Sequence, residues 1–195
     1  MSEKISQLEY SEQARQRVVV GLRWDPQRLP FYLRWITPSG KQGYDLDLTC
    51  YIFNNYGDFS GIVSGEDLVH EDGSGAIYHS GDDKTGEFGH NDEEISIELV
   101  NLPEDVAHIV FIVTCKSAHS FDDVKNPNVR LTDAKTQRDQ IKTDLDKDGA
   151  DHNAHVFVRL FKEGTTWMVE EVNEYLDQSK IDNWPVYLQE KWSLA

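Results

Sequence analysis

The sequence lacks any apolar run long enough to cross a membrane. A transmembrane helix needs about 20 consecutive apolar residues, and no segment of the 195 residues approaches that length. The N-terminal stretch MSEKISQLEYSEQARQR also lacks the apolar centre of a secretory signal peptide. We therefore expect a cytoplasmic protein that does not insert into a membrane.

Cysteine and the common catalytic motifs are equally scarce. The chain has two cysteines, Cys50 and Cys115, each inside an apolar, strand-like run. Without a secretory signal, two buried free thiols are expected rather than a disulfide. The nucleophile elbow and the phosphate-cradling glycine motifs are absent from the sequence. These absences favour a protein without catalytic activity.

Positive charge is also in short supply. The chain has 19 Lys and Arg residues against 35 Asp and Glu residues, a formal net charge of −16. Nucleic acid and anionic membrane surfaces would repel such a protein, whereas cations would be attracted to it. We therefore expect no nucleic-acid partner.

Segments with strand chemistry follow one another over most of the chain. YDLDLTCYIF (residues 44–53) alternates strictly, which predicts a half-buried strand. AHIVFIVTC (residues 107–115) is continuously apolar, which is typical of a central strand covered on both faces. HVFVRLF and TTWMVEE are joined by KEG, a hairpin signal. The pattern predicts an all-β protein with an antiparallel β-sandwich fold.

The domain organisation is expected to be simple. We predict an N-terminal arm over residues 1–16, a β-sandwich domain over residues 17–170 and a helical C-terminal extension over residues 171–195. In VEEVNEYLDQSK, Val172, Tyr175 and Leu176 have helical spacing. Pro185 interrupts the next segment, so two short helices are expected.

Residues 79–94, HSGDDKTGEFGHNDEE, concentrate negative charge between glycines. Hard cations such as Ca²⁺ need six to eight oxygen ligands, and glycine allows the tight turns that bring such ligands together. A divalent ion would turn mutual repulsion into a force that orders the loop. The acids concerned are Asp82, Asp83, Glu87, Asp92, Glu93 and Glu94.

Two further acidic groups are candidates. Asp45 and Asp47 are two residues apart on a strand and therefore share a face, which is either open to solvent or covered. Tyr51 and Phe53 continue that face and favour a covered one. The second group resembles the first half of an EF-hand loop, although the Glu expected at its twelfth position is replaced by a histidine. This group is either a metal site or an ordinary hydrated loop, and it consists of Asp144, Asp146 and Asp148.

Six stretches occur in this order along the chain: VVVGLRWD, YDLDLTCYIF, GSGAIYHSGDDKTGEFGHNDEEISIEL, LPEDVAHIVFIVTC, NVRL and HVFVRLFKEGTTWMV. Together they resemble the TerD family of tellurium-resistance and stress proteins over about residues 17–170. The resemblance implies an antiparallel β-sandwich with acidic calcium-binding loops, here with a short helical C-terminal extension. It also implies Ca²⁺ as the bound ion and a non-catalytic scaffold or binding role in a bacterial stress response.

The metal motif of the family can be carried over position by position. The paired strand aspartates of the family fall on Asp45 and Asp47. Asp83 stands where the family usually has Asn, and Asn91 stands where it usually has Asp, so both positions keep an oxygen donor. The resemblance thus implies a calcium site formed by Asp45, Asp47, Asp82, Asp83, Thr85, Gly86, Asn91, Asp92 and Glu93.

Two alternatives concern function and partners. His79 and His90 flank the acidic loop, so a metal-dependent hydrolase with histidine and carboxylate ligands is the alternative function. Besides calcium ions, we expect another protein of the same stress system as a partner. The large apolar residues of the extension either pack on the sandwich or bind that partner, and they are Trp184, Tyr187, Leu188 and Trp192.

Overall fold

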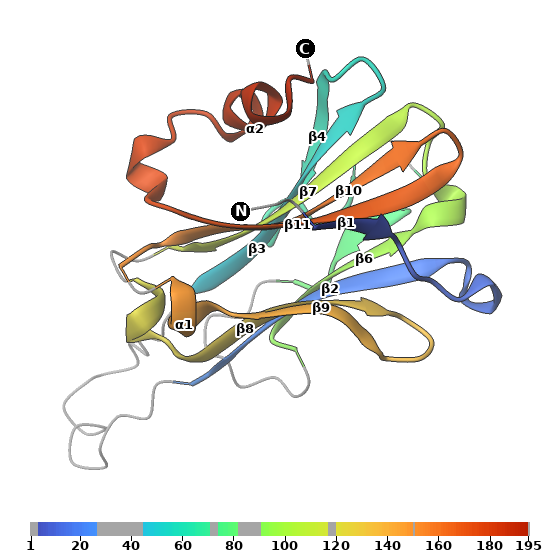
Figure 1. The fold of residues 1–195 in the computed structure, drawn as a ribbon. Helices are drawn as coiled ribbons and strands as arrows, with labels where there is room; N and C mark the ends of the chain where they lie inside the picture. The colour runs from blue at the N-terminus through green and yellow to red at the C-terminus, as the bar shows by residue number, and fades with distance from the viewer. Residues whose placement is uncertain are drawn as a thin grey trace.

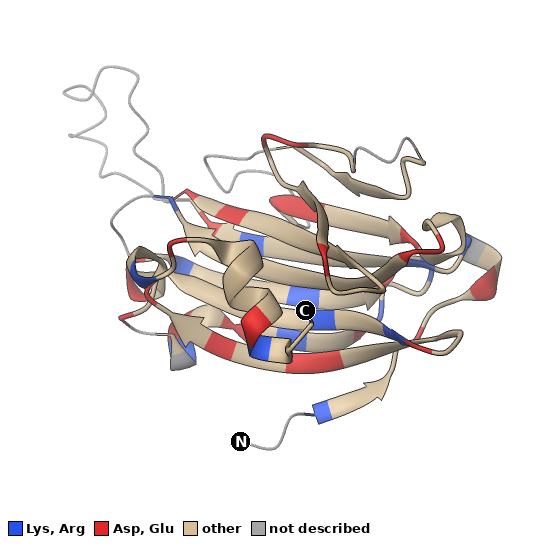
Figure 2. Ribbon diagram, turned by 90° about the horizontal axis from the view of Figure 1, so that it is seen from above, with Lys and Arg blue, Asp and Glu red and all other residues tan. Residues whose placement is uncertain are grey.

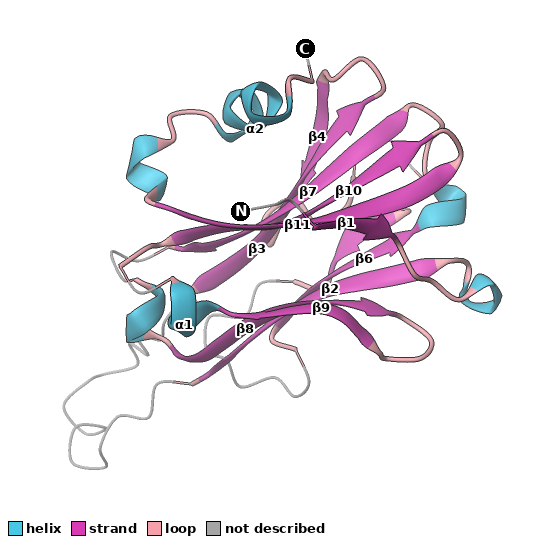
Figure 3. Ribbon diagram, in the orientation of Figure 1, coloured by secondary structure: helices cyan, strands magenta, loops and turns pink. Residues whose placement is uncertain are grey.

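The computed structural model shows two antiparallel sheets packed face to face (Figure 1, Figure 3). It describes residues 4–26, 45–70, 74–81, 91–116, 120–149 and 151–194. The six-stranded sheet has the order β1-β11-β10-β7-β3-β4, and the five-stranded sheet has the order β5-β6-β2-β8-β9. The prediction of an antiparallel β-sandwich is confirmed.

The strands of the six-stranded sheet are β1 (Lys4–Gln7), β3 (Leu46–Asn54), β4 (Phe59–Val63), β7 (Val106–Cys115), β10 (Ala154–Glu163) and β11 (Thr166–Leu176). Those of the five-stranded sheet are β2 (Arg17–Asp25), β5 (Ile77–His79), β6 (Glu93–Glu98), β8 (Lys125–Asp133) and β9 (Asp139–Asp144). The helices are η1 (Glu12–Ala14), η2 (Leu99–Asn101), η3 (Phe121–Asp123), α1 (Leu145–Asp148), η4 (Gln178–Lys180) and α2 (Trp184–Trp192). Of the helices in the described ranges, none has the length and apolar character of a membrane span.

The alternation predicted for β3 builds two separate hydrophobic layers. Leu46, Leu48, Cys50 and Ile52 lie in the core between the two sheets. Phe53 lies in a second buried cluster on the opposite face of the sheet. β7 contributes to both layers, as expected for a central strand without alternation.

The second layer is covered by α2, which lies over the outer face of the six-stranded sheet (Figure 1). Leu188 is fully buried there, and Trp184, Tyr187 and Trp192 pack around it. Asn183 caps the helix by accepting a hydrogen bond from Val186 N–H at 3.1 Å. The apolar residues of the extension therefore pack on the sandwich.

The expected helix at residues 171–176 is wrong, because these residues complete β11. Val172 and Leu176 are four apart, which places them on one face in a strand as well as in a helix. Both pack in the α2 layer, whereas Tyr175 packs against the core between the sheets. Pairing of Tyr175 with His155 of β10 holds the segment in the sheet.

The predicted boundaries at residues 16 and 170 stay predictions. β1 pairs with β11 through Lys4 and Glu171, so the N-terminal arm contributes a strand to the six-stranded sheet.

Seen from above, acidic positions are spread over the strands and connections, with basic positions among them (Figure 2). Among the described residues, acidic positions are therefore not confined to one element, and the buried carboxylates have to be located individually.

Candidate metal centre

Four of the predicted metal ligands lie where strands of both sheets meet at one end of the sandwich. β3 begins and β7 ends there, and β6 begins beside the final part of β2. A hydrogen bond of 2.7 Å from Leu48 N–H to Glu93 Oε2 joins β3 of one sheet to β6 of the other. We call this group the acidic end, and it consists of Asp45, Asp47, Asp92 and Glu93.

Glu93 is the most deeply buried member of the acidic end, with 0% of its surface exposed. β4 pairs with β3 only from Cys50 onward, so the edge of β3 that faces β4 is not paired with β4 at Leu48. The backbone N–H of Leu48 donates a hydrogen bond to the Glu93 carboxylate. Burial raises the pKa of Glu93 to about 7, although hydrogen bonds from His79 and Leu48 act in the opposite direction. The charge of this carboxyl group therefore changes near neutral pH.

His79 faces Glu93 inside the protein. Its Nδ1 accepts a hydrogen bond from Gly81 N–H at 2.9 Å, so a neutral ring carries its proton on Nε2. Nε2 lies 3.3 Å from Glu93 Oε2. Because both ring nitrogens face protein groups, this geometry does not favour His79 as the ligand of a hydrolytic metal. His90, the other histidine of that alternative, lies outside the described residues.

Asp92 is fastened to the neighbouring strand β2. Its backbone N–H donates to Leu22 O at 2.9 Å. Its Oδ2 accepts a hydrogen bond from Trp24 N–H at 2.8 Å. With 7% of its surface exposed, the Asp92 carboxylate is held in a defined orientation close to Glu93 in the chain.

Asp45 and Asp47 are both in contact with Lys116, which directly follows β7. The Asp45 carbonyl accepts a hydrogen bond from Lys116 N–H at 3.0 Å. The Lys116 ammonium lies 2.6 Å from Asp47 Oδ1, and Asp47 is 5% exposed. A positive charge is thus already accommodated beside one carboxylate of the acidic end.

Asn91 precedes Asp92 but is directed to the outer face of the five-stranded sheet. Its Oδ1 accepts a hydrogen bond from Arg130 Nε at 2.9 Å. Its Nδ2 donates to Glu94 Oε1 at 2.5 Å. Arg130 and Glu94 thus hold the Asn91 carboxamide between them.

The remaining predicted ligands of the calcium loop are Asp82, Asp83, Thr85 and Gly86, and they lie outside the described residues. Of the EF-hand-like group, Asp144 is engaged by Lys142 and Lys147. Contact with Lys147 is the main cause that lowers the pKa of Asp144. The segment that follows forms the short helix α1.

The chemistry of the individual side chains at the acidic end suits a hard cation. These side chains are all carboxylates, the ligand type that Ca²⁺ prefers, and Lys116 shows that the surroundings tolerate a cation. Within the part of the chain that the structure describes, no three His, Cys, Asp or Glu side chains form a group able to hold a metal ion. A complete site would therefore need ligands from residues 82–90 as well.

Three residues of this region were missed by the sequence analysis as contacts of the predicted ligands. Their contributions are the ammonium of Lys116, the buried ring of His79 and the guanidinium of Arg130. Lys116 was within reach of prediction, because an antiparallel pair of β3 and β7 brings the start of one strand to the end of the other. The other two contacts depend on the register of the five-stranded sheet, which local periodicity does not specify.

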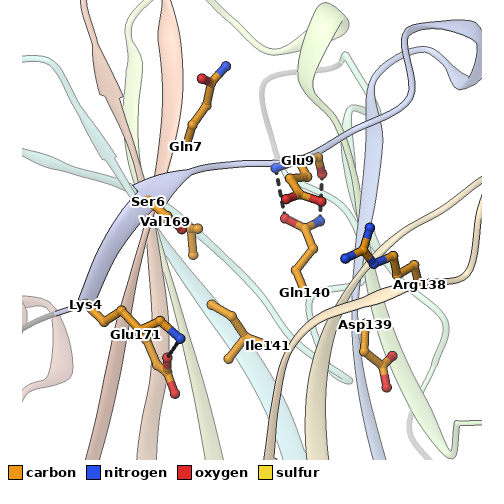
Figure 4. Close-up of a pocket in the computed structure, with 10 residues that line it drawn as sticks. All are labelled: Lys4, Ser6, Gln7, Glu9, Arg138, Asp139, Gln140, Ile141, Val169 and Glu171. Carbon is orange, nitrogen blue, oxygen red and sulfur yellow. Dashed lines mark hydrogen bonds and ion pairs between the residues drawn. The ribbon is translucent and has the colours of Figure 1, made fainter.

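A separate cavity of about 120 Å³ lies where β1, β9 and β11 approach one another (Figure 4). The Gln140 carboxamide accepts from Glu9 N–H at 2.9 Å and donates to Glu9 O at 2.6 Å. Lys4 and Glu171 form an ion pair of 3.5 Å at another part of its wall. This lining mixes both signs of charge and does not resemble the carboxylate set of the acidic end.

Comparison with known proteins supports the family resemblance. Tellurium resistance protein TerD of Serratia marcescens is 29% identical over 164 residues, which cover 80% of this chain and 79% of that protein. General stress protein 16U of Bacillus subtilis (strain 168) is 28% identical over 159 residues, covering 77% of this chain and 76% of that protein.

A solved structure shares the fold. The crystal structure of a homologue of telluride resistance protein (TerD) from Streptomyces coelicolor A3(2) matches with a TM-score of 0.65 at 21% identity, covering 83% of this chain and 90% of that chain. A family model described as the TerD domain matches residues 3–181 and ends before α2. The resemblance inferred from the sequence is confirmed, and the chain belongs to the TerD family.

Proposed function

We propose that this chain is a calcium-binding, non-catalytic scaffold or binding protein in a cytoplasmic stress response of the tellurite-resistance type. Membership of the TerD family supports the stress-response part, since relatives are named tellurium resistance protein and general stress protein. The calcium part is supported by the chemistry of the acidic end.

The observation that carries the calcium proposal is the burial of several carboxylates at one end of the sandwich. Asp47, Asp92 and Glu93 are 5%, 7% and 0% exposed. Burying a carboxylate is costly unless hydrogen bonds or a positive charge compensate. Lys116 and the hydrogen bonds from Trp24 and Leu48 supply part of this compensation, and a divalent cation would add to it while linking β3 of one sheet to β6 of the other.

The protein residues have distinct tasks in this proposal. Asp45, Asp47, Asp92 and Glu93 present oxygen ligands from the strand ends, and the predicted loop residues complete the set. Lys116 gives up its contact with Asp47 when the ion binds. Because the pKa of Glu93 is about 7, binding near neutral pH releases protons.

We place the protein partner at the acidic end rather than at the C-terminal extension. Leu188 of α2 is buried against the six-stranded sheet, and its aromatic neighbours are used in the same packing. A calcium ion that orders the acidic end would present a fixed surface to another protein of the same stress system.

Thermal unfolding with calcium and with chelator tests the proposal. An ion that binds only the folded state raises Tm by mass action, so millimolar calcium should raise Tm relative to EDTA. Asp82→Ala should remove most of this increase, while the matched control Asp144→Ala should retain it. The absence of any increase in the wild-type chain would refute the calcium proposal, and loss of the increase in Asp144→Ala alone would move the site to the EF-hand-like segment.

A further inference from the structure

A glycine lies between two opposite charges on the outer face of the five-stranded sheet. Gly21 of β2 is paired with Glu94 of β6 on one side and with Arg130 of β8 on the other. The three positions therefore form one row across three strands. The central position of this row has no side chain, which leaves room above β2.

The side chain of Asn91 occupies that room. A Cβ atom placed on Gly21 would lie 2.4 Å from Asn91 Nδ2 and 2.5 Å from Asn91 Cγ. Such distances are well inside van der Waals contact, so any larger residue at position 21 would push the carboxamide away. Glycine at position 21 therefore allows the Asn91 side chain to approach the backbone of β2 closely.

The two ends of the Asn91 carboxamide have different partners, and each suits its chemistry. The oxygen accepts from Arg130 Nε at 2.9 Å and also from Arg130 Nη2. The nitrogen donates to Glu94 Oε1 at 2.5 Å. Hydrogen bonds to ionised groups are stronger than neutral ones, so the carboxamide is held in one orientation.

Asp92 and Glu93, which follow Asn91 in the chain, are also held by hydrogen bonds. Asp92 is bonded to β2 through its backbone and its side chain, and Glu93 accepts from Leu48 N–H. Three successive residues, directly after residues 82–90, are thus held by hydrogen bonds. The first of these hydrogen bonds in chain order joins Asn91 to Arg130.

We propose that Asn91 is a positioning residue and not a calcium ligand, and that Arg130 and Glu94 hold it over Gly21 so that Asp92 and Glu93 are presented in a fixed orientation. This inference rests on the proposed calcium function and deepens it. Groups that orient metal ligands from behind typically contribute about 10- to 100-fold to metal affinity.

Variants at these positions are expected to fold. Asn91, Glu94 and Arg130 line a polar hollow of about 160 Å³ on the outer face of the sheet, away from the hydrophobic core. In Arg130→Met the aliphatic part of the side chain is kept while the guanidinium is removed. Arg15→Met is the matched control, because Arg15 pairs with Glu98, at the far end of β6 from the acidic end.

Calcium titration by calorimetry tests the proposal in a double-mutant cycle. Arg130→Met and Asn91→Ala should each weaken calcium affinity by about tenfold, with unchanged stoichiometry and little change of Tm in EDTA. The double variant should bind no more weakly than either single variant, because both changes remove the same contact. Gly21→Ala should weaken binding similarly, and Arg15→Met should bind like the wild type.

The possible results separate this inference from the proposed function. If the wild type binds calcium and Arg130→Met binds equally tightly, the positioning role is refuted while the calcium function stands. If the losses of the two single variants multiply in the double variant, Asn91 acts independently of Arg130 and the positioning role is again refuted. If the wild type binds no calcium, the proposed function fails and this inference fails with it.

Discussion

Two buried glutamates, one beneath α2 and one at the acidic end, are held in different ways. Glu170 lies beneath α2 with 1% of its surface exposed, and Glu93 lies at the acidic end with 0% exposed. Glu170 Oε2 is 2.7 Å from Arg159 Nε, and Trp192 Nε1–H donates to Glu170 Oε1 at 3.2 Å. The Arg159 guanidinium lies over the ring of Trp192 at 4.8 Å. A permanent cation and an aromatic cover thus compensate the Glu170 charge.

Glu93 is stabilised to a smaller extent by its surroundings. Hydrogen bonds from Leu48 N–H and His79 are among its contacts, and burial still raises its pKa to about 7. The comparison teaches that burial alone does not define a binding site. The α2 layer compensates Glu170 with the permanent charge of Arg159, whereas at the acidic end burial outweighs the hydrogen bonds to Glu93 and raises its pKa.

The largest expected effect comes from breaking the compensated pair under α2. Glu170→Ala would leave the Arg159 guanidinium buried, with its side chain only 12% exposed. Removing one partner of a buried ion pair costs about 3–5 kcal/mol of stability, which urea denaturation would measure. Glu171→Ala is the control, since Glu171 pairs with the exposed Lys4 and should lose less than about 1 kcal/mol. Equal losses in the two variants would contradict the difference between the surfaces.

The next effect concerns the pH dependence caused by Glu93, measured in chelator. Its folded-state pKa is about 7 against an ordinary value of 4.5, so between these values the folded chain keeps a proton that the unfolded chain has lost. This contribution is fully present below pH 4.5 and is lost as pH rises to about 7, on the order of 3 kcal/mol. Glu93→Gln should remove it, and the exposed control Glu163→Gln should not. Parallel stability curves for the wild type and Glu93→Gln would show that burial does not govern this carboxyl group.

The smallest effect tests the Lys116 ammonium, which lies beside Asp47 at the acidic end. If Lys116 competes with calcium for Asp47, Lys116→Met should tighten calcium binding about threefold to fivefold, since a partly exposed ion pair is worth up to about 1 kcal/mol. Lys125→Met is the control, because Lys125 pairs with Asp25 at 3.5 Å. Calorimetric titration distinguishes the two, and weaker binding in Lys116→Met would mean that the lysine supports the site instead.

Much of the fold was predictable because periodicity is a local property. The alternation in β3 correctly assigned Leu48 to the core between the sheets and Phe53 to a second covered face. What covers that face was left open, because α2 is distant in the sequence. Residues 171–176 were misassigned because Val172 and Leu176, four residues apart, lie on one face in both a helix and a strand. The predicted ligands between residues 82 and 90 stay predictions.

By itself, the sequence determined the strands, the faces they bury, the family and the acidic character of the candidate site. These properties follow from residue type and spacing along a few neighbouring positions. Only the tertiary structure decided that Arg159 compensates the charge of Glu170 and that His79 lies beside Glu93. It also decided that the Asn91 carboxamide lies between Arg130 and Glu94. The physical reason is that a buried charge is defined by its neighbours, and sheet register and packing bring those neighbours from distant parts of the chain.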